Sequence, residues 1–233
     1  MIEISNGLYQ LADFKLAINV RIPSNSITAV LGPSGAGKST LLNIISGFEG
    51  LKQGQLKIDG KSAADLRPHE RPLTAVFQDN NCFAHLSAWQ NVALGIRPSL
   101  RLTAAETALV ENALDRVGLL ALKDRRPGDM SGGERQRIGL ARVLVRQQPI
   151  LLLDEAFAAL GPAMRRSLLS LTRELQREQQ LTVLMVTHQP EDARLVADHV
   201  IFVDEGVVRS PVTTAQFFAT ADEAVSRYLG DVT

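Results

Sequence analysis

The stretch ITAVLGPSGAGKST (residues 27–40) joins an apolar run to a glycine-rich loop. Residues 27–31 form the kind of short apolar run that is typical of a strand buried on both faces of a parallel sheet. The loop has the pattern G-x-x-x-x-G-K-[ST] and leads into the apolar residues of a helix. Glycines let backbone N–H groups approach phosphate oxygens, and a helix N-terminus adds a positive end. The stretch therefore predicts a strand–loop–helix unit that binds the phosphates of a nucleotide.

The residues of this loop are candidates for phosphate and metal binding. Lys38 would reach the β- and γ-phosphates, and the Ser39 hydroxyl would be a ligand of Mg²⁺. A flexible glycine–serine linker is the alternative interpretation, but a linker would not stand between a buried strand and a helix. The predicted nucleotide contacts are Gly32, Pro33, Ser34, Gly35, Ala36, Gly37, Lys38, Ser39 and Thr40.

A second apolar run, residues 150–153, ends in the adjacent carboxylates Asp154 and Glu155. Open α/β sheets place their ligands at the carboxyl ends of the strands, so this pair should lie beside the phosphate loop. We expect Asp154 to hold Mg²⁺ through water and Glu155 to polarise the attacking water as a general base. Alone, the run would be more typical of a strand that enters a solvated turn, and it is the phosphate loop that favours catalysis.

Composition sets the broad class of the protein. The 233 residues suffice for one large domain or a core with an inserted subdomain, and 45% apolar residues can form a sizeable core. Lysine plus arginine equals aspartate plus glutamate at 25 each, which argues against a dedicated nucleic-acid binder. The single cysteine, Cys82, cannot form an internal disulfide and is expected to be a buried thiol. Neither a signal peptide nor a spanning apolar stretch is present, so a membrane role would come through a partner.

Strand and helix patterns alternate along the chain. Residues 182–186 and 200–203 resemble the earlier buried runs. A helix is predicted over residues 103–117, where Thr103 and Glu106 form a capping box. Pro162 is expected at the first position of another helix. This alternation predicts an α/β fold.

The middle of the chain has helical patterns but no convincing strand. Residues 80–147 are therefore interpreted as an inserted helical subdomain that carries the segment 131–134 discussed next. Residues 1–79 and 148–233 then make up the nucleotide-binding core of a single domain.

Residues Ser131-Gly132-Gly133-Glu134 resemble the L-S-G-G-Q signature of ATP-binding-cassette ATPases, and they lie shortly before the acidic strand, as in that family. The resemblance covers nearly the whole chain. It implies a P-loop NTPase core with a mixed, largely parallel sheet, an N-terminal antiparallel β-subdomain and an inserted α-helical subdomain. It also implies ATP as ligand, sandwiched in a head-to-tail dimer in which the signature of one copy clamps the γ-phosphate held by the other. Ser131 and Glu134 form a capping box at the start of a helix, whose N-terminus is an anion site.

The same resemblance assigns three further residues. Tyr9 occupies the place of an aromatic that stacks on adenine. Gln78 matches the glutamine that contacts Mg²⁺ and senses the membrane subunit, and His188 matches the histidine that contacts the γ-phosphate. Each has a plainer structural interpretation on its own, but the series at family spacing favours the functional one. The predicted catalytic set is Glu155, His188, Lys38 and Gln78, with Ser39, Gln78 and Asp154 at the metal.

Three positions after the carboxylates depart from the family pattern Asp-Glu-Pro-x-Ser-x-Leu-Asp. They are Ala156, Ala158 and Gly161. Glycine is an acceptable helix N-cap before Pro162, within a few tenths of a kcal/mol of aspartate. The family aspartate reaches across the dimer, so Gly161 should weaken coupling between the two sites without removing the chemical step.

The chain most resembles subunits of bacterial importers, because it has no fused membrane segment and ends soon after the core. Residues 77–92 resemble the thiamine-importer subfamily. This implies a permease partner, an indirect periplasmic solute-binding protein, and a place on the cytoplasmic face of the inner membrane. An importer of Fe(III), polyamine or another small solute, and a weakly hydrolysing nucleotide-gated clamp, remain alternatives.

Other proteins with a phosphate loop and a signature fit less well. DNA-repair ATPases carry a long coiled coil between the two motifs, whereas the segment between Lys38 and Asp154 is short and lacks sustained heptads. Translation-associated cassette proteins have two cassettes in one chain. An exporter or lipoprotein-releasing ATPase stays open.

Overall fold

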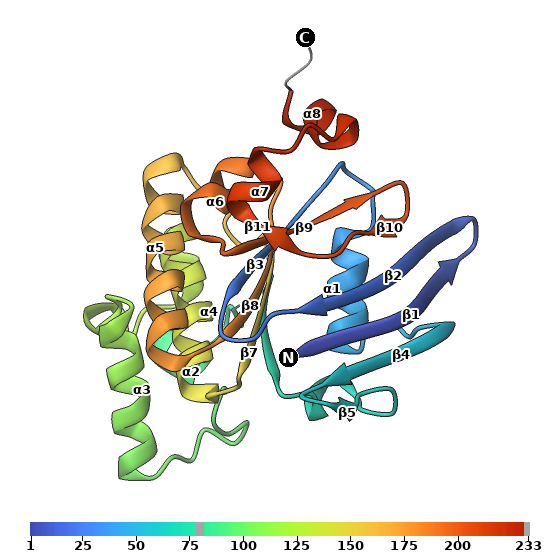
Figure 1. The fold of residues 1–233 in the computed structure, drawn as a ribbon. Coiled ribbons are helices and arrows are strands. Elements are labelled where there is room, and N and C mark those ends of the chain that lie inside the picture. The colour runs from blue at the N-terminus through green and yellow to red at the C-terminus, as the bar shows by residue number, and fades with distance from the viewer. Residues whose placement is uncertain (78–81, 231–233) are drawn as a thin grey trace.

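A computed structural model describes residues 1–77 and 82–230 of the chain. Its strands form one eleven-stranded sheet in the order β5-β4-β1-β2-β10-β9-β3-β8-β7-β6, with β11 paired to β9 (Figure 1). The strands are β1 (Ile2–Leu11), β2 (Phe14–Ile22), β3 (Ile27–Leu31), β4 (Gln53–Ile58), β5 (Lys61–Ser62), β6 (Leu73–Phe77), β7 (Ile150–Asp154), β8 (Thr182–Val186), β9 (His199–Asp204), β10 (Val207–Val208) and β11 (Val212–Thr213). The helices are α1 (Lys38–Ser46), α2 (Ala88–Ala93), α3 (Ala104–Arg116), α4 (Gly132–Arg146), α5 (Pro162–Gln179), α6 (Pro190–Val196), α7 (Thr214–Phe218) and α8 (Glu223–Leu229).

The sheet has a parallel part and an antiparallel part. β6, β7, β8, β3 and β9 pair in parallel, which brings the carboxyl ends of β3 and β7 to the same edge. β1, β2, β4 and β5 pair antiparallel, and β10 joins the two parts through β2 and β9. The mixed sheet with an N-terminal antiparallel portion confirms the predicted fold class.

Burial along the strands explains the two parts. All five residues of β3 are buried, as expected for an apolar run covered on both faces. β2 instead alternates buried and exposed positions over most of its length, so one face is packed and the other meets solvent. Along β7, Leu151 and Leu153 join the core beneath α4 and α5, while Ile150 and Leu152 join the core around α1.

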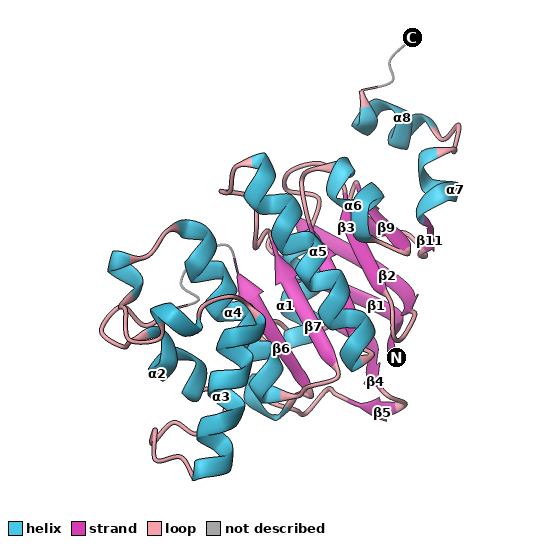
Figure 2. Ribbon diagram, turned by 90° about the vertical axis from the view of Figure 1, so that its left-hand side faces the viewer, coloured by secondary structure: helices cyan, strands magenta, loops and turns pink. Residues whose placement is uncertain are grey.

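Helices cover both faces of the parallel strands. α1 packs between the parallel strands and the antiparallel part, and α4 and α5 cover the opposite face (Figures 1 and 2). Local signals set several helix ends. Thr103 caps α3 with Glu106 completing the box, and Pro162 is the first residue of α5. Both boundaries agree with the sequence.

The described part of residues 80–147 contains α2, α3, α4 and single helical turns, and no strand. α4 packs against α2, α3, α5 and β6, so this part is tied to the core along one helix. The division into a core and an inserted subdomain itself stays a prediction. Within the described ranges, no helix combines the length and apolar character that a membrane crossing requires.

One side chain differs from expectation, and a second is an apolar residue left at the surface. Cys82 is only half-buried, because it lies at the surface of the helical part with its Sγ 3.6 Å from the carbonyl oxygen of Arg135. Met164 belongs to the apolar pattern of α5 but remains exposed at 37%. It lies against Gly133 at the start of α4, where an added Cβ would come within 2.8 Å of its side chain.

Candidate functional site

The phosphate loop connects the carboxyl end of β3 to α1. Gly37 caps α1 with φ +110° and supplies no side-chain hydrogen bond, so the helix N-terminus is left open. Gly32 has φ +147°, and a Cβ there would come within 2.0 Å of the Val203 carbonyl oxygen. Glycine is therefore required at both positions, by backbone conformation and by the close approach of β9.

Lys38 lies inside this loop rather than in solvent. Its Nζ donates to the carbonyl oxygens of Gly32 at 2.8 Å and Pro33 at 2.7 Å. Burial lowers the pKa of Lys38, and the carboxylates of Glu155 and Asp154 oppose that shift. The ammonium group thus shapes the loop and stands where an anion bound by the loop would meet it.

Asp154 ends β7 and faces the start of α1. Its Oδ1 accepts a hydrogen bond from the Ser39 Oγ at 3.0 Å. Burial raises the pKa of Asp154; the Ser39 hydroxyl opposes this and the neighbouring Glu155 adds to it. A half-buried carboxylate beside a hydroxyl is a pair of hard oxygen donors, which fits Mg²⁺ completed by water and phosphate. Within the described ranges, no group of three His, Cys, Asp or Glu forms a metal cluster of protein ligands alone.

Glu155 and His188 meet across the ends of β7 and β8. Glu155 Oε1 lies 2.5 Å from His188 Nε2. Glu155 has φ +50°, a strained conformation for a residue other than glycine, and its N–H donates to the Val186 carbonyl oxygen at 3.2 Å. The turn thereby directs a carboxylate of limited exposure toward the histidine.

These groups surround one cavity of about 230 Å³. The phosphate loop supplies one wall, and the ends of β7 and β8 supply the other. The lining residues are Ser34, Gly35, Gly37, Lys38, Ser39, Thr40, Glu155 and His188. The structure therefore brings together the predicted phosphate loop, the acidic strand and the histidine.

The signature segment stands apart from this cavity, at the N-terminus of α4. Ser131 Oγ accepts from the Glu134 N–H at 3.3 Å, and a Glu134 carboxylate oxygen accepts from the Ser131 N–H at 2.7 Å. Hydrogen bonding of the Glu134 carboxylate to the backbone and the hydroxyl of Ser131 lowers the pKa of Glu134. The predicted capping box is present, and the predicted phosphate contacts of residues 131–134 are not part of the cavity within a single chain.

Tyr9 differs from the expectation of a free stacking ring. It is 6% exposed and packs edge-on against Phe14, with ring centroids 6.3 Å apart. Phe14 lies closer to the loop, since a Cβ on Gly37 would come within 3.0 Å of its Cζ. The adenine-stacking role of Tyr9 stays a prediction that requires the ring to be uncovered. Gln78 lies outside the described residues.

Two contacts around this site were not predicted from the sequence. Arg165, in the first turn of α5, donates to the carbonyl oxygens of Ala158 and Leu160 at 3.3 and 3.2 Å. Thr187, the residue before His188, donates a hydrogen bond from its Oγ1 to Asp192 in α6 at 2.7 Å. The spacing of Thr187 and Asp192 around Pro190 is a local pattern that could have indicated the second contact.

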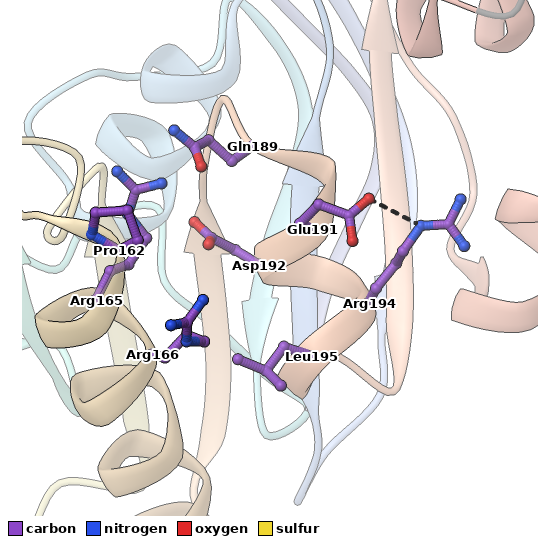
Figure 3. A pocket seen from close by; sticks show the side chains of 8 residues that line it. All are labelled: Pro162, Arg165, Arg166, Gln189, Glu191, Asp192, Arg194 and Leu195. Carbon is purple, nitrogen blue, oxygen red and sulfur yellow. Dashed lines mark ion pairs between the residues drawn. The ribbon is translucent and has the colours of Figure 1, made fainter.

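A second cavity, of about 540 Å³, lies between the first turns of α5 and the length of α6 (Figure 3). Its charged residues largely have partners already. Arg194 pairs with Glu191 at 3.3 Å and lies over the Phe218 ring at 3.6 Å, while Arg165 and Asp192 hold the loops named above. Two of its lining residues thus hold neighbouring loops, and none of the phosphate-loop residues lines it.

The chain is similar to known proteins in sequence and in fold. The family model described as ABC transporter matches residues 16–158. The chain belongs to the ABC transporter family. It is 47% identical to the thiamine import ATP-binding protein ThiQ of Chelativorans sp. (strain BNC1), over 93% of this chain and 88% of that protein. It is 48% identical to the protein of that name from Mesorhizobium japonicum, over 98% and 91%.

Solved ABC structures share the fold. CbiO1 from Clostridium perfringens, described as part of the ABC transporter complex cbiONQ, is 31% identical with a TM-score of 0.84, covering 98% of this chain and 94% of that one. The ATP-binding cassette MJ0796, solved as a dimer bound to ADP and Pi, is 26% identical with a TM-score of 0.76, covering 92% and 99%. This ABC protein therefore binds ATP and couples its hydrolysis to transport, as the resemblance predicted.

Proposed function

We propose that the chain is the ATP-hydrolysing subunit of a bacterial thiamine importer. The observation that carries this is the 45–48% identity, over nearly the whole chain, to proteins named for thiamine import. The segment 77–92, which resembles the same subfamily, supports it from the sequence. Transport of Fe(III), polyamine or another small solute is the alternative.

The site supports a division of labour among its residues. Lys38 leaves the carbonyl oxygens of its own loop and neutralises the β- and γ-phosphates of ATP. Ser39 and Asp154, with Gln78, would hold Mg²⁺, which when bound neutralises phosphate oxygens. Glu155 accepts the proton of the attacking water, and His188 orients that carboxylate and contacts the γ-phosphate.

One chain carries both halves of a divided site. The loop half lines the cavity, and the signature half, Ser131 to Glu134, lies at the N-terminus of α4 outside it. Two copies in a head-to-tail arrangement would each supply the missing half to the other. The permease holds this dimer at the cytoplasmic face of the inner membrane, and a periplasmic binding protein delivers the solute.

The test is solute uptake by proteoliposomes that contain the chain, its cognate permease and the periplasmic protein. We expect ATP-dependent accumulation of labelled thiamine, abolished by Lys38→Ala because that variant loses nucleotide binding. Labelled Fe(III) and putrescine are the matched comparison solutes. Accumulation of either in place of thiamine would contradict the solute assignment while leaving the ATPase assignment intact.

A further inference from the structure

The C-terminal helix α8 lies over the edge of the sheet from which the phosphate loop rises (Figure 1). Two contacts dock it there. Asp222 caps the helix by accepting from the Val225 N–H at 3.1 Å and pairs with Arg209 at 2.8 Å. Val225 is 3% exposed and joins the main core. α8 is therefore a packed element of this edge.

Tyr228 links α8 to strand β9 beside the first residue of the phosphate loop. Its ring packs on Phe202 of β9, with centroids 5.5 Å apart and planes at 58°. Phe202 pairs in register with Leu31, the residue before Gly32. The ring thus stands beside the point where β3 becomes the phosphate loop.

The hydroxyl of Tyr228 is closed off from solvent and has no hydrogen bond of full geometry within the described ranges. Burial raises the pKa of Tyr228, and the backbone N–H of Gly32 opposes that shift, so the N–H lies near the phenol oxygen. A buried hydroxyl without a partner is costly, and native structures rarely keep one without a use. Here the unsatisfied acceptor faces the loop.

Gly32 is held on its other side as well. Its carbonyl oxygen accepts from Lys38 Nζ at 2.8 Å, and the backbone of Val203 leaves no room for a Cβ. When Lys38 turns to the phosphates of ATP, the Gly32 carbonyl, which belongs to the Gly32–Pro33 peptide, loses that hydrogen bond. Gly32 is then free to turn about its own Cα, which would align the N–H of the preceding Leu31–Gly32 peptide with the waiting hydroxyl.

We propose that Tyr228 is a positioning residue for nucleotide binding, whose hydroxyl accepts the Gly32 N–H once Lys38 has left the Gly32 carbonyl. α8 is then a latch that stabilises the ATP-bound form of the phosphate loop. The proposal rests on ATP binding at this loop, as in the proposed function. It concerns the affinity for nucleotide, since Tyr228 does not touch the reacting atoms.

The experiment compares Tyr228→Phe with Phe218→Leu. The first variant removes only the hydroxyl. The second removes the Phe218 ring, which belongs to the same C-terminal segment and packs on Phe217 and Arg194. ATP dissociation constants are measured by fluorescent-nucleotide displacement in a Glu155→Gln background, which keeps ATP intact. Steady-state kcat and KM are measured in the native background, and unfolding midpoints are measured with and without nucleotide.

Loss of one hydrogen bond predicts about three- to tenfold weaker ATP binding for Tyr228→Phe, with a matching rise in KM and an unchanged kcat at saturation. Its unfolding midpoint without nucleotide should equal that of the native chain, and Phe218→Leu should keep the native dissociation constant. A native ATP dissociation constant in Tyr228→Phe would overturn the proposal that α8 is a latch. A lower unfolding midpoint without nucleotide, together with an unchanged dissociation constant, would overturn it as well, because the hydroxyl would then have only a structural role. Absence of ATP binding by the native chain would instead remove the proposed function, and the latch with it.

Discussion

The two ends of the parallel sheet each carry a half-buried aspartate, and the fold treats them in opposite ways. At the amino end, Asp198 accepts from Arg173 through both carboxylate oxygens at 2.7 Å and from the Ile27 N–H at 2.8 Å. At the carboxyl end, Asp154 accepts from Ser39 at 3.0 Å and has no ion pair within the described ranges. One carboxylate is neutralised within the fold, and the other is left short of positive charge.

The pKa shifts of the two groups follow this difference. Burial acts to raise the pKa of Asp198, but the hydrogen bonds from Arg173 and Ile27 outweigh it and the pKa is lowered. For Asp154 burial prevails, and the pKa is raised. Asp198 is thus paired with a cation of the fold, whereas burial disfavours the charged form of Asp154, as expected of a group that a bound ligand would complete.

The largest expected effect is on turnover in Asp154→Asn. Loss of the charge at this proposed metal ligand should lower steady-state ATP hydrolysis by about 100-fold or more. The free energy of unfolding should be unchanged or slightly higher at pH 7, because the neutral amide avoids the cost of a buried charge. Turnover assays with Mg²⁺ check the loss of hydrolysis, and urea unfolding checks the free energy of unfolding. Native turnover in Asp154→Asn would contradict the contrast drawn between the two aspartates.

Asp198→Asn should show the reverse pattern. Removing the charge leaves the Arg173 guanidinium half-buried without its partner, so the free energy of unfolding should fall by about 1–3 kcal/mol. Turnover per folded molecule should stay native, because Asp198 lies at the opposite end of the sheet from the nucleotide site. Urea titration and active-site-normalised kinetics are the measurements; a large loss of kcat with native stability would be the contrary result.

The pH dependence of stability sharpens the same contrast. Since the folded pKa of Asp198 is lowered, its contribution is complete above the pKa of the unfolded chain, about 3.9, and is lost as the pH falls through the folded value. The stability difference between the native chain and Asp198→Asn should therefore be constant from pH 6 to 8 and shrink below about pH 4. Unfolding midpoints across this range test it, and a difference that grows toward acid pH would contradict the sign.

The smallest expected effect concerns Gly161, the N-cap of α5. Its φ of −63° and ψ of 156° suit any residue, and a Cβ there would meet no atom within 4 Å. Gly161→Asp should therefore change the free energy of unfolding by only a few tenths of a kcal/mol, and ATP turnover should be at least native. A collapse of activity in the folded variant would show that the loop after Glu155 has adapted to glycine.

Local patterns in the sequence predicted most of what forms locally. The buried runs gave β3, β7 and β8 because burial on both faces demands continuous apolar residues, and the capping box at Thr103 set the start of α3. The phosphate loop was predicted for the same reason, because its backbone conformation is local and requires glycine at fixed positions in a short segment.

Contacts between distant segments were not predictable in this way. The burial of Tyr9 depends on Phe14 across a hairpin, and the approach of Tyr228 to Gly32 depends on how the C-terminal segment packs over β9. The loop contacts of Arg165 likewise arise from the path of the chain before α5. Such contacts are set by packing among elements, which residue spacing alone does not specify.

The most direct test of the central claim, that the carboxyl edge of the sheet is a working ATPase site, is steady-state ATP turnover of the native chain beside Glu155→Gln. Both are measured with Mg²⁺, with and without the permease. We predict turnover in the native chain and its loss in Glu155→Gln, with ATP binding retained by both, because the amide cannot accept the proton of the attacking water. Native turnover in Glu155→Gln, or ATP binding without turnover in the native chain under every condition, would contradict it.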